Sequence, residues 1–232
     1  MAANQSAVPD AQEIFDGVAE NYERPAQIFG LGQYRYWHRE LVGLVAATTP
    51  SHVLDMCTGT GLIADELRRQ TTAAIVGVDL SRAMLKQARG RGVEAALIQA
   101  DAQRPPFTAG AFDAVVFSYL LRYVDDLPGT LLRLGALVRP RGLMASLEFG
   151  VPQGPWKPAW QLYTRALMPV GLALLSPGWR RVGGFLGRSI SEFYERWPIE
   201  RQLRAWHTAG FQDVQTRSLS LGGGLLIWGT RQ

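Results

Sequence analysis

The fold is decided by the stretch Val53-Leu54-Asp55-Met56-Cys57-Thr58-Gly59-Thr60-Gly61. A short apolar run, typical of a buried strand, leads straight into two glycines, and a helix is expected to start near Leu62. Gly59 and Gly61 can adopt dihedrals closed to other residues and let the backbone approach a ligand. Free N–H groups at the start of the helix favour an electron-rich partner. The stretch therefore predicts a turn that binds a nucleotide cofactor.

Strands and helices alternate along the chain from this point. Apolar runs rich in β-formers cover residues 52–56, 73–78, 95–99, 114–118 and 143–149, with helical segments between them. Strands that lack an in/out alternation are typical of a parallel sheet covered on both faces. A helix over 200–208 and two strands near 214–219 and 225–230 close the pattern. We predict an α/β fold whose sheet ends in a hairpin.

The remaining segments flank this core. Residues 11–21 and 34–47 have helical spacing, separated by a Gly- and Pro-containing stretch at 25–32, whereas 156–194 is aromatic-rich and punctuated by Pro and Gly. No linker or repeat interrupts the 232 residues, so we expect one domain over 1–232. Its parts are an N-terminal helical cap (1–48), a cofactor-binding core (50–150), a helical lid insertion (151–198) and a closing helix with hairpin (199–232).

Composition restricts the compartment and the partners. The net charge is +4, but residues 151–232 carry ten Lys/Arg against four Asp/Glu, while residues 1–150 carry fourteen against sixteen. Such an excess can attract acidic lipid or an anionic substrate, or form a solvated face. Cys57 is the only cysteine, which excludes an intrachain disulfide. With no leader-like start and no apolar run of roughly 20 residues, we expect a cytoplasmic protein that does not span a membrane.

The glycine turn by itself leaves the cofactor open. Gly59-x-Gly61-x-x-Ala64 also satisfies the dinucleotide fingerprint, and Asp79 lies at a suitable distance to hold a ribose through its two hydroxyls. A nicotinamide-dependent oxidoreductase is therefore an alternative. However, no Tyr-x-x-x-Lys pair or other constellation for hydride transfer is found in the sequence.

Polar residues at further strand ends complete the predicted ligand site. Asp101 and Ala102 follow the third strand, where a carboxylate or its neighbouring backbone can bind the exocyclic amine of adenine. Ser118 ends the fourth strand, beside the switch point at which open sheets bind ligands. Together with the glycine turn and Asp79, four strand ends are predicted to face one ligand.

These motifs resemble class I methyltransferases, and specifically the ubiquinone/menaquinone biosynthesis C-methyltransferase family. The likeness covers nearly the whole chain. Besides the cofactor motifs, it rests on Phe15-Asp16-Gly17-Val18-Ala19 with Tyr22, Leu121-Arg122-Tyr123-Val124, Leu147-Glu148-Phe149 with Pro152, Ser189-Ile190-Ser191-Glu192-Phe193, Ala209-Gly210-Phe211 and Leu221-Gly222-Gly223.

The resemblance implies a Rossmann-like, seven-stranded, mostly parallel sheet with an antiparallel last strand, and S-adenosylmethionine as cofactor, with S-adenosylhomocysteine as product. It places cofactor contacts at Thr60, Asp79, Asp101, Ala102 and Ser118, to which we add Asp55, Thr58, Gly59, Gly61 and Leu80 from the same strand ends. The chain departs from the family pattern near the expected substrate pocket. Ala26-Gln27 stands where an Asn-Asp pair is usual, and Tyr123 where an Asn follows the arginine.

Methyl transfer is an in-line displacement that needs alignment and exclusion of water, and it requires no metal. Arg122 is predicted to stabilise the oxyanion of an aromatic acceptor, and Tyr22 to orient that acceptor. The substrate is predicted to be lipophilic: a quinol methylated on carbon, or another phenolic or polyketide-like metabolite methylated on oxygen or carbon. A catalytically silent methyltransferase-like binding module is a third alternative.

The lid and the partners are the last expectations from the sequence. Residues 156–197 suit a lid over a hydrophobic substrate and contact with a membrane surface, or a helical cap packed on the sheet. His38, His52 and His207 lack the spacing of metal ligands, so no metal is expected. No nucleic-acid partner is expected, because the basic residues do not cluster with aromatic ones. A homodimer is left open.

Overall fold

The computed structural model describes residues 13, 15–23, 25, 28, 30 and 32–232. Its centre is a seven-stranded sheet with the strand order β3-β2-β1-β4-β5-β7-β6. The first five strands are mutually parallel, and β7 runs antiparallel to both β5 and β6. This confirms the predicted mostly parallel sheet. The strands are β1 (His52–Met56), β2 (Ala74–Asp79), β3 (Ala96–Gln99), β4 (Phe112–Ser118), β5 (Val138–Phe149), β6 (Phe211–Leu219) and β7 (Gly224–Arg231).

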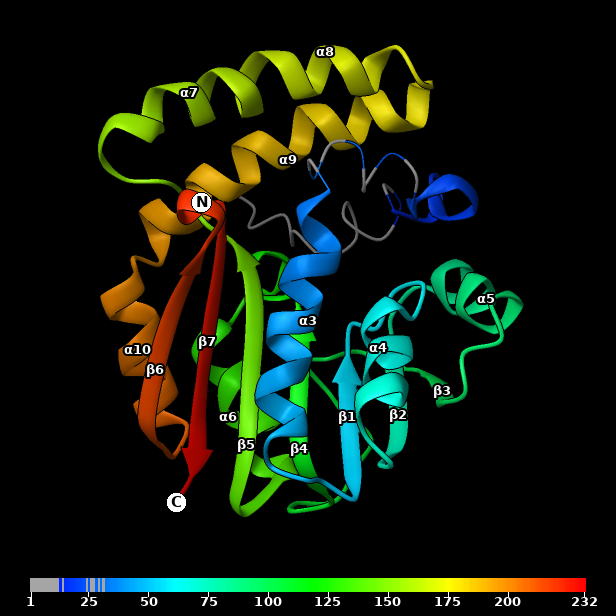
Figure 1. Ribbon diagram of the computed structural model, residues 1–232, viewed down its shortest axis with the longest axis vertical. Helices are drawn as coiled ribbons and strands as arrows, with labels where there is room; N and C mark the ends of the chain where they lie inside the picture. The colour runs from blue at the N-terminus through cyan, green and yellow to red at the C-terminus, as the bar shows by residue number, and fades with distance from the viewer. Residues whose placement is uncertain (1–12, 14, 24, 26–27, 29, 31) are drawn as a thin grey trace, which may run out of the picture.

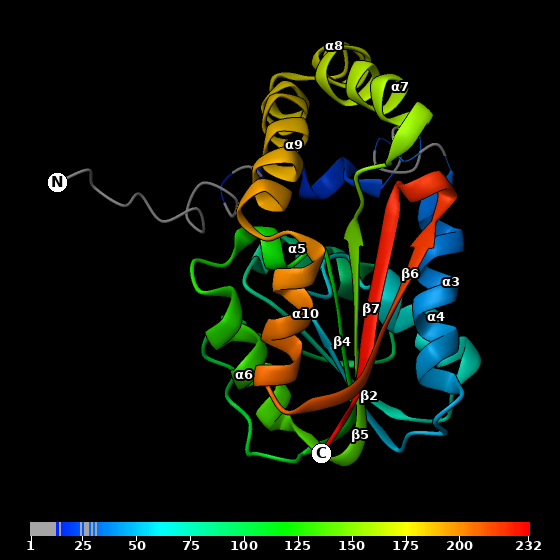
Figure 2. The same ribbon diagram turned by 90° about the vertical axis from the view of Figure 1, so that its left-hand side faces the viewer.

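Helices cover both faces of the sheet (Figure 2). On one face lie α3 (Gln33–Ala46) and α4 (Leu62–Gln70), and on the other α6 (Leu127–Leu137) and α10 (Ile199–Thr208), while α5 (Arg82–Gly90) packs against β2 and β3. Each face has its own apolar core: Leu41 and Leu67 belong to the first, Leu131 and Trp206 to the second. Because β1 and β4 are covered on both sides, their side chains are buried on both faces, which explains their uninterrupted apolar runs.

The lid lies beyond the carboxyl ends of the parallel strands (Figure 1). It is formed by α7 (Lys157–Leu162), a π-helical turn η4 (Tyr163–Leu167), α8 (Met168–Ala173) and the long α9 (Pro177–Arg196). The predicted helical lid insertion is therefore confirmed. Pro158 and Pro177 lie in the first turns of α7 and α9, where a missing N–H costs no hydrogen bond. None of the helices in the described part of the chain could cross a bilayer.

The π-helical turn has a local cause. Pro169 lacks an N–H, and its ring would collide with the carbonyl of residue 165 in a regular α-helix. Widening the helix over Tyr163–Leu167 removes this conflict, and it lets the chain stay helical from Lys157 to Ala173.

Short 3-10 turns complete the chain: η1 (Ala19–Asn21), η2 (Leu121–Tyr123), η3 (Gly154–Trp156) and η5 (Ser220–Gly222). The predicted helix over 11–21 lies partly outside the described residues, and its last three residues form η1. The pair Ala26-Gln27 also lies outside them. The fifth strand begins at Val138 rather than at 143, because Phe112 pairs with Val138 before the register shifts to Ala114 and Leu143.

Candidate functional site

The glycine turn has the backbone that the sequence predicts. Gly59 and Gly61 have φ angles of 57° and 81°. A Cβ on Gly61 would lie 2.7 Å from Val93 Cγ2, whereas a Cβ on Gly59 would meet no atom within 4 Å. Gly61 is thus required by packing at the start of α4, while Gly59 borders open space in which a ligand can approach.

Asp79, at the end of β2, connects the glycine turn to the next helix. Its Oδ2 accepts a hydrogen bond from the Gly59 N–H and its Oδ1 one from the Ser81 N–H, both at 2.8 Å. Ser81 in turn caps α5 by accepting from the Met84 N–H. Burial raises the pKa of Asp79, and the two N–H donors oppose that shift. The carboxylate therefore sets the shape of the turn as well as facing the ligand space.

A cavity of about 550 Å³ opens at these strand ends, between the sheet and the lid. Eight of the ten predicted cofactor residues line it, together with both predicted catalytic residues: Thr58, Gly59, Thr60, Asp79, Leu80, Asp101, Ala102, Ser118, Arg122 and Tyr22. Asp55 and Gly61 do not. The Asp55 carboxyl instead lies in β1, where it accepts a 2.5 Å hydrogen bond from the Thr58 hydroxyl, and burial raises its pKa to about 7. Asp55 supports the turn from beneath.

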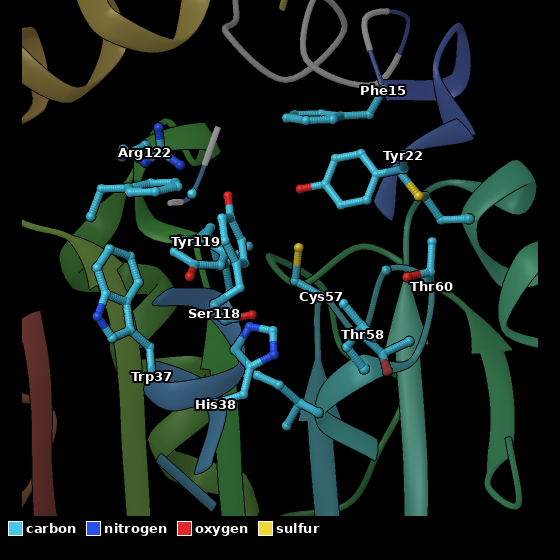
Figure 3. A pocket seen from close by; sticks show the side chains of 18 of the residues that line it. Phe15, Tyr22, Trp37, His38, Cys57, Thr58, Thr60, Ser118, Tyr119 and Arg122 are labelled. Atoms are coloured by element: carbon cyan, nitrogen blue, oxygen red, sulfur yellow. The ribbon is translucent and has the colours of Figure 1, made fainter. Parts of the chain in front are cut away.

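The other side of the cavity is aromatic, and the sequence motifs include its Phe149 but neither Tyr119 nor Tyr34. Tyr119 stacks on Phe149 with ring centroids 4.5 Å apart, and Tyr34 packs against both rings. In Figure 3 the hydroxyls of Tyr22 and Tyr119 and the Cys57 thiol project into the same space. The helical spacing over 34–47 indicates only that Tyr34 and His38 belong to an apolar helix face, because one face of α3 covers the sheet while its first turns reach the cavity.

Two residues that are not glycine adopt left-handed backbone at this point. Cys57 and Tyr119 have φ angles of 66° and 57°, and they directly follow the adjacent strands β1 and β4. Such a conformation costs of order 1–3 kcal/mol and tends to be kept where function needs it. Here it turns both side chains from the sheet toward the cavity.

Several buried polar atoms lining the cavity lack a hydrogen-bond partner within the described residues. They include His38 Nε2, Thr60 Oγ1 and the Tyr119 hydroxyl. A buried polar group without a partner costs about 1–3 kcal/mol, so a polar ligand that supplied the partners would be favoured. The cavity thus combines an aromatic wall with a small number of unsatisfied polar groups, as small-molecule sites do.

His38 is buried in this wall, edge-on to Tyr34. Burial lowers its pKa to about 4, opposed by the charge of Glu66. The native protein therefore binds fewer protons at this residue than the unfolded chain between about pH 6.5 and pH 4. The contribution of His38 to stability is complete above pH 6.5 and falls as the pH is lowered through this window.

We expect this loss to be measurable against a variant that cannot titrate. Relative to His38→Phe, the free energy of unfolding of the native protein should fall by roughly 3 kcal/mol between pH 7 and pH 4, as judged by urea denaturation. Parallel curves for His38→Phe and the native protein would contradict the assignment.

Arg122 and Glu148 form a buried ion pair at the carboxyl ends of β4 and β5. The Arg122 Nε lies 3.2 Å from Glu148 Oε2, and both side chains are almost fully inaccessible. Glu148 Oε1 accepts from the Leu121 N–H, and Arg122 Nη1 donates to the Ser189 hydroxyl of α9. Burial by itself lowers the pKa of Arg122, but Tyr123 and Glu148 outweigh it and raise it. The guanidinium is therefore charged and held in one orientation at the cavity wall.

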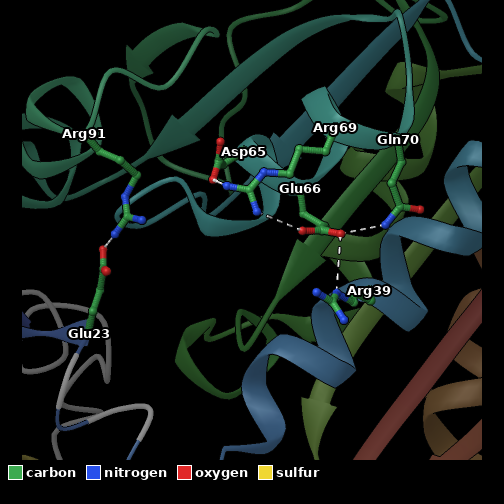
Figure 4. A network of polar contacts seen from close by, with 7 residues as sticks. All are labelled: Glu23, Arg39, Asp65, Glu66, Arg69, Gln70 and Arg91. Atoms are coloured by element: carbon green, nitrogen blue, oxygen red, sulfur yellow. Dashed lines mark hydrogen bonds and ion pairs between the residues drawn. The ribbon is translucent and has the colours of Figure 1, made fainter.

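A polar network forms the rim of the cavity on the side of α4 (Figure 4). Glu66 contacts Arg39 and Gln70 and shares Arg69 with Asp65, and Arg91 pairs with Glu23 of the N-terminal segment. Exposed ion pairs of this kind contribute little stability, about 0–1 kcal/mol each. The pair between Arg91 and Glu23 connects the N-terminal segment to the end of α5 at the cavity rim.

The site has the groups that S-adenosylmethionine needs. A carboxylate at the end of β2 suits ribose hydroxyls, the open space beside Gly59 admits a close ligand, and the unpaired Thr60 hydroxyl can bind a polar end. No group of three or more potential metal-ligating side chains occurs within the described residues.

Known proteins identify the family. The sequence profile of the ubiE/COQ5 methyltransferase family matches residues 2–231. A demethylmenaquinone methyltransferase of Streptomyces avermitilis is 33% identical over 218 residues, which are 92% of this chain and 90% of the relative. The ubiquinone/menaquinone biosynthesis C-methyltransferase UbiE of Desulfotalea psychrophila is 31% identical over 229 residues, 96% and 91% of the two chains.

A solved structure agrees with the fold. An S-adenosylmethionine-dependent methyltransferase from Thermotoga maritima superposes with a TM-score of 0.61 at 17% identity, covering 95% of this chain and 99% of that one. The family match resolves the ambiguity of the glycine turn in favour of S-adenosylmethionine, and it overturns the oxidoreductase and silent-module alternatives. The chain belongs to the ubiE/COQ5 methyltransferase family of S-adenosylmethionine-dependent enzymes.

Proposed function

We propose that this enzyme methylates a ring carbon of a lipophilic quinol, as the names of its demethylmenaquinone methyltransferase relatives suggest for those proteins. The observation that carries the proposal is the single cavity in which the glycine turn faces an aromatic wall bearing Arg122 and Tyr22. A flat ring held against this wall would lie within reach of a methyl donor held by the turn.

The cofactor is assigned to the residues at the strand ends. Asp79 would accept the ribose hydroxyls, with Leu80 beside it, and Asp101 with Ala102 would surround the adenine. Thr58, Gly59, Thr60 and Ser118 would surround the methionine end. Asp55 and Gly61 act indirectly, since one supports Thr58 and the other allows the start of α4 to pack on Val93.

The acceptor is assigned to Arg122 and Tyr22. Bound S-adenosylmethionine supplies an electrophilic methyl group. A charged guanidinium fixed by Glu148 would stabilise negative charge on the ring hydroxyl, which makes the neighbouring carbon more nucleophilic. Burial raises the pKa of the Tyr22 hydroxyl, so this group stays neutral and can donate a hydrogen bond to the acceptor. Tyr22 stacks on Trp179 of the lid, which ties its position to the closed cavity.

A second acceptor class is favoured by one specific feature. Tyr123 stands where the family usually has Asn, and it stacks on Phe185 of α9 with ring centroids 5.9 Å apart while lying 4.9 Å from the Arg122 guanidinium. This replaces an amide with an aromatic ring beside the predicted oxyanion site. Methylation of another phenolic or polyketide-like metabolite, on oxygen or carbon, is therefore the alternative.

The assay that tests the proposal uses a short-chain demethylmenaquinol and S-adenosylmethionine with a deuterated methyl group. We expect a product with one labelled methyl bound to ring carbon, as read by mass spectrometry and NMR. The oxidised quinone should not react, because it has no ionisable hydroxyl to activate the ring. A methyl ether as product would favour the alternative, and no product from either quinol or simple phenols would contradict both.

Contact of residues 156–197 with a membrane belongs to the same proposal. A lipophilic quinol resides in a bilayer, and the lid forms one side of the cavity through Trp160, Tyr163 and Met168 among others. A homodimer is a separate prediction.

A further inference from the structure

The lid carries a concentration of exposed apolar side chains on its outer surface. Of the eleven large hydrophobic residues that are exposed within the described chain, six fall within twenty residues. We define the outer apolar face as Trp156, Leu162, Leu167, Val170, Leu174 and Leu175. Leu174 is 83% exposed. In Figures 1 and 2, α7 and α8 form the edge of the molecule farthest from the sheet, and no other element of the described chain lies beyond them.

Helix geometry separates this face from the cavity. Leu167, Val170 and Leu174 follow each other at helical spacing, and the π-helical turn, in which i and i+5 are neighbours, aligns Leu162 with Leu167. The same offset aligns Tyr163 with Met168, and these two line the cavity whereas the outer residues do not. The helical segment Lys157–Ala173, which we call the lid helix, thus has one apolar side that lines the cavity and another apolar side that is exposed.

A third side of the lid helix is covered by α9. A Cβ on Gly187 would lie 2.4 Å from the Thr164 carbonyl oxygen, and one on Gly183 would lie 3.0 Å from Pro169 Cα. These two glycines, four residues apart, let the helices pack in backbone contact. Because α9 covers this side and the cavity takes another, nothing in the described chain covers the outer apolar face.

The charge of the lid indicates what covers it. Between Glu148 and Glu192 the sequence contains no acidic residue, while Lys157, Arg165, Arg180, Arg181 and Arg188 lie in that interval. A second copy brought face to face would place these like charges together, which is unfavourable. An anionic bilayer attracts them, at about 1 kcal/mol for each cation near its surface, and accepts exposed leucines at the acyl boundary.

We propose that the outer apolar face, together with the exposed cations of the lid, docks the enzyme on the surface of an anionic bilayer. The enzyme then lies with its lid between the bilayer and the cavity. The benefit of docking rests on the lipophilic acceptor of the proposed function, which would be delivered from the same bilayer, whereas docking itself requires neither cofactor nor acceptor.

The test is flotation of the full chain with vesicles of phosphatidylglycerol and phosphatidylcholine, against vesicles of phosphatidylcholine alone. We expect binding to the anionic vesicles that weakens with salt, and at least a ~10-fold loss in the variant Leu167→Gln/Val170→Gln/Leu174→Gln. The matched control is Leu132→Gln, which removes an exposed leucine from α6 and should leave binding unchanged. S-adenosylhomocysteine affinity, measured by calorimetry, should be the same in all three proteins and reports that the fold is intact.

Three outcomes would overturn the docking proposal. They are no binding of the native protein to anionic vesicles at low salt, equal binding by the triple variant, and a concentration-dependent dimer in solution that only the triple variant lacks. The last would assign the face to a second copy. Vesicle binding without methylation of any quinol would instead contradict the proposed function and leave docking intact.

Discussion

Replacing Arg122 by leucine is expected to abolish measurable methyl transfer and to lower the free energy of unfolding by about 3–5 kcal/mol. The stability loss arises because the Glu148 carboxylate, only 2% exposed, would stay buried without its cation. The loss of turnover arises because the cation that the proposed mechanism assigns to the ring hydroxyl would be gone. Urea denaturation and the deuterated-methyl assay measure the two effects, and affinity for S-adenosylmethionine should be nearly unchanged.

A double variant separates the structural from the catalytic part. Arg122→Leu/Glu148→Leu removes both charges, so much of the stability should return, since a buried pair replaced by apolar groups is often neutral. Turnover should not return. A double variant that methylates at the native rate would remove Arg122 from the chemistry and leave it a purely structural role.

Replacing Asp79 by asparagine is expected to weaken S-adenosylmethionine binding by roughly 100-fold, which corresponds to about 2.7 kcal/mol. The carboxylate accepts from two backbone N–H groups, one in the glycine turn and one at the start of α5. An asparagine can accept through one oxygen only, and its NH₂ group would face the other N–H as a second donor. The turn would shift, and the ribose would lose its charged acceptor.

Calorimetry with S-adenosylmethionine and S-adenosylhomocysteine measures this effect. Asp126→Asn is the matched control: Asp126 caps α6 by accepting from the Gly129 N–H, but it does not line the cavity. The Asp126→Asn variant should also lose some stability, but its affinity for S-adenosylmethionine should equal that of the native protein. Native affinity in Asp79→Asn would contradict the assignment of Asp79 to the cofactor.

The alternation of strands and helices and the cofactor side of the site can be predicted because their determinants are local. A strand buried on both faces shows as an apolar run, and a turn that needs positive φ shows as glycine. Residues at the carboxyl ends of parallel strands meet at one edge whatever the details of packing, so the sequence alone places Asp79, Asp101 and Ser118 together. Eight of the ten residues predicted for the cofactor do line the cavity.

The lid and the substrate wall cannot be predicted in the same way. A helical lid is predicted over 151–198, but its packing is not: the sequence does not show that Gly183 and Gly187 of α9 lie where two lid helices come into backbone contact. Arg122 is recognisable in the sequence, but its pairing with Glu148 is not, because the pair joins residues 26 positions apart across two strands.

The sequence by itself determined the sheet and the glycine turn of a nucleotide-cofactor site, since these follow from side-chain periodicity and from residues that act within a few positions of one another. Only the tertiary structure decided which polar groups of the wall are buried without a partner among the described residues, that Asp55 supports the turn from outside the cavity, and that one lid helix presents an apolar surface to solvent. These properties depend on what packs against each side chain, and that is set by elements distant in the chain.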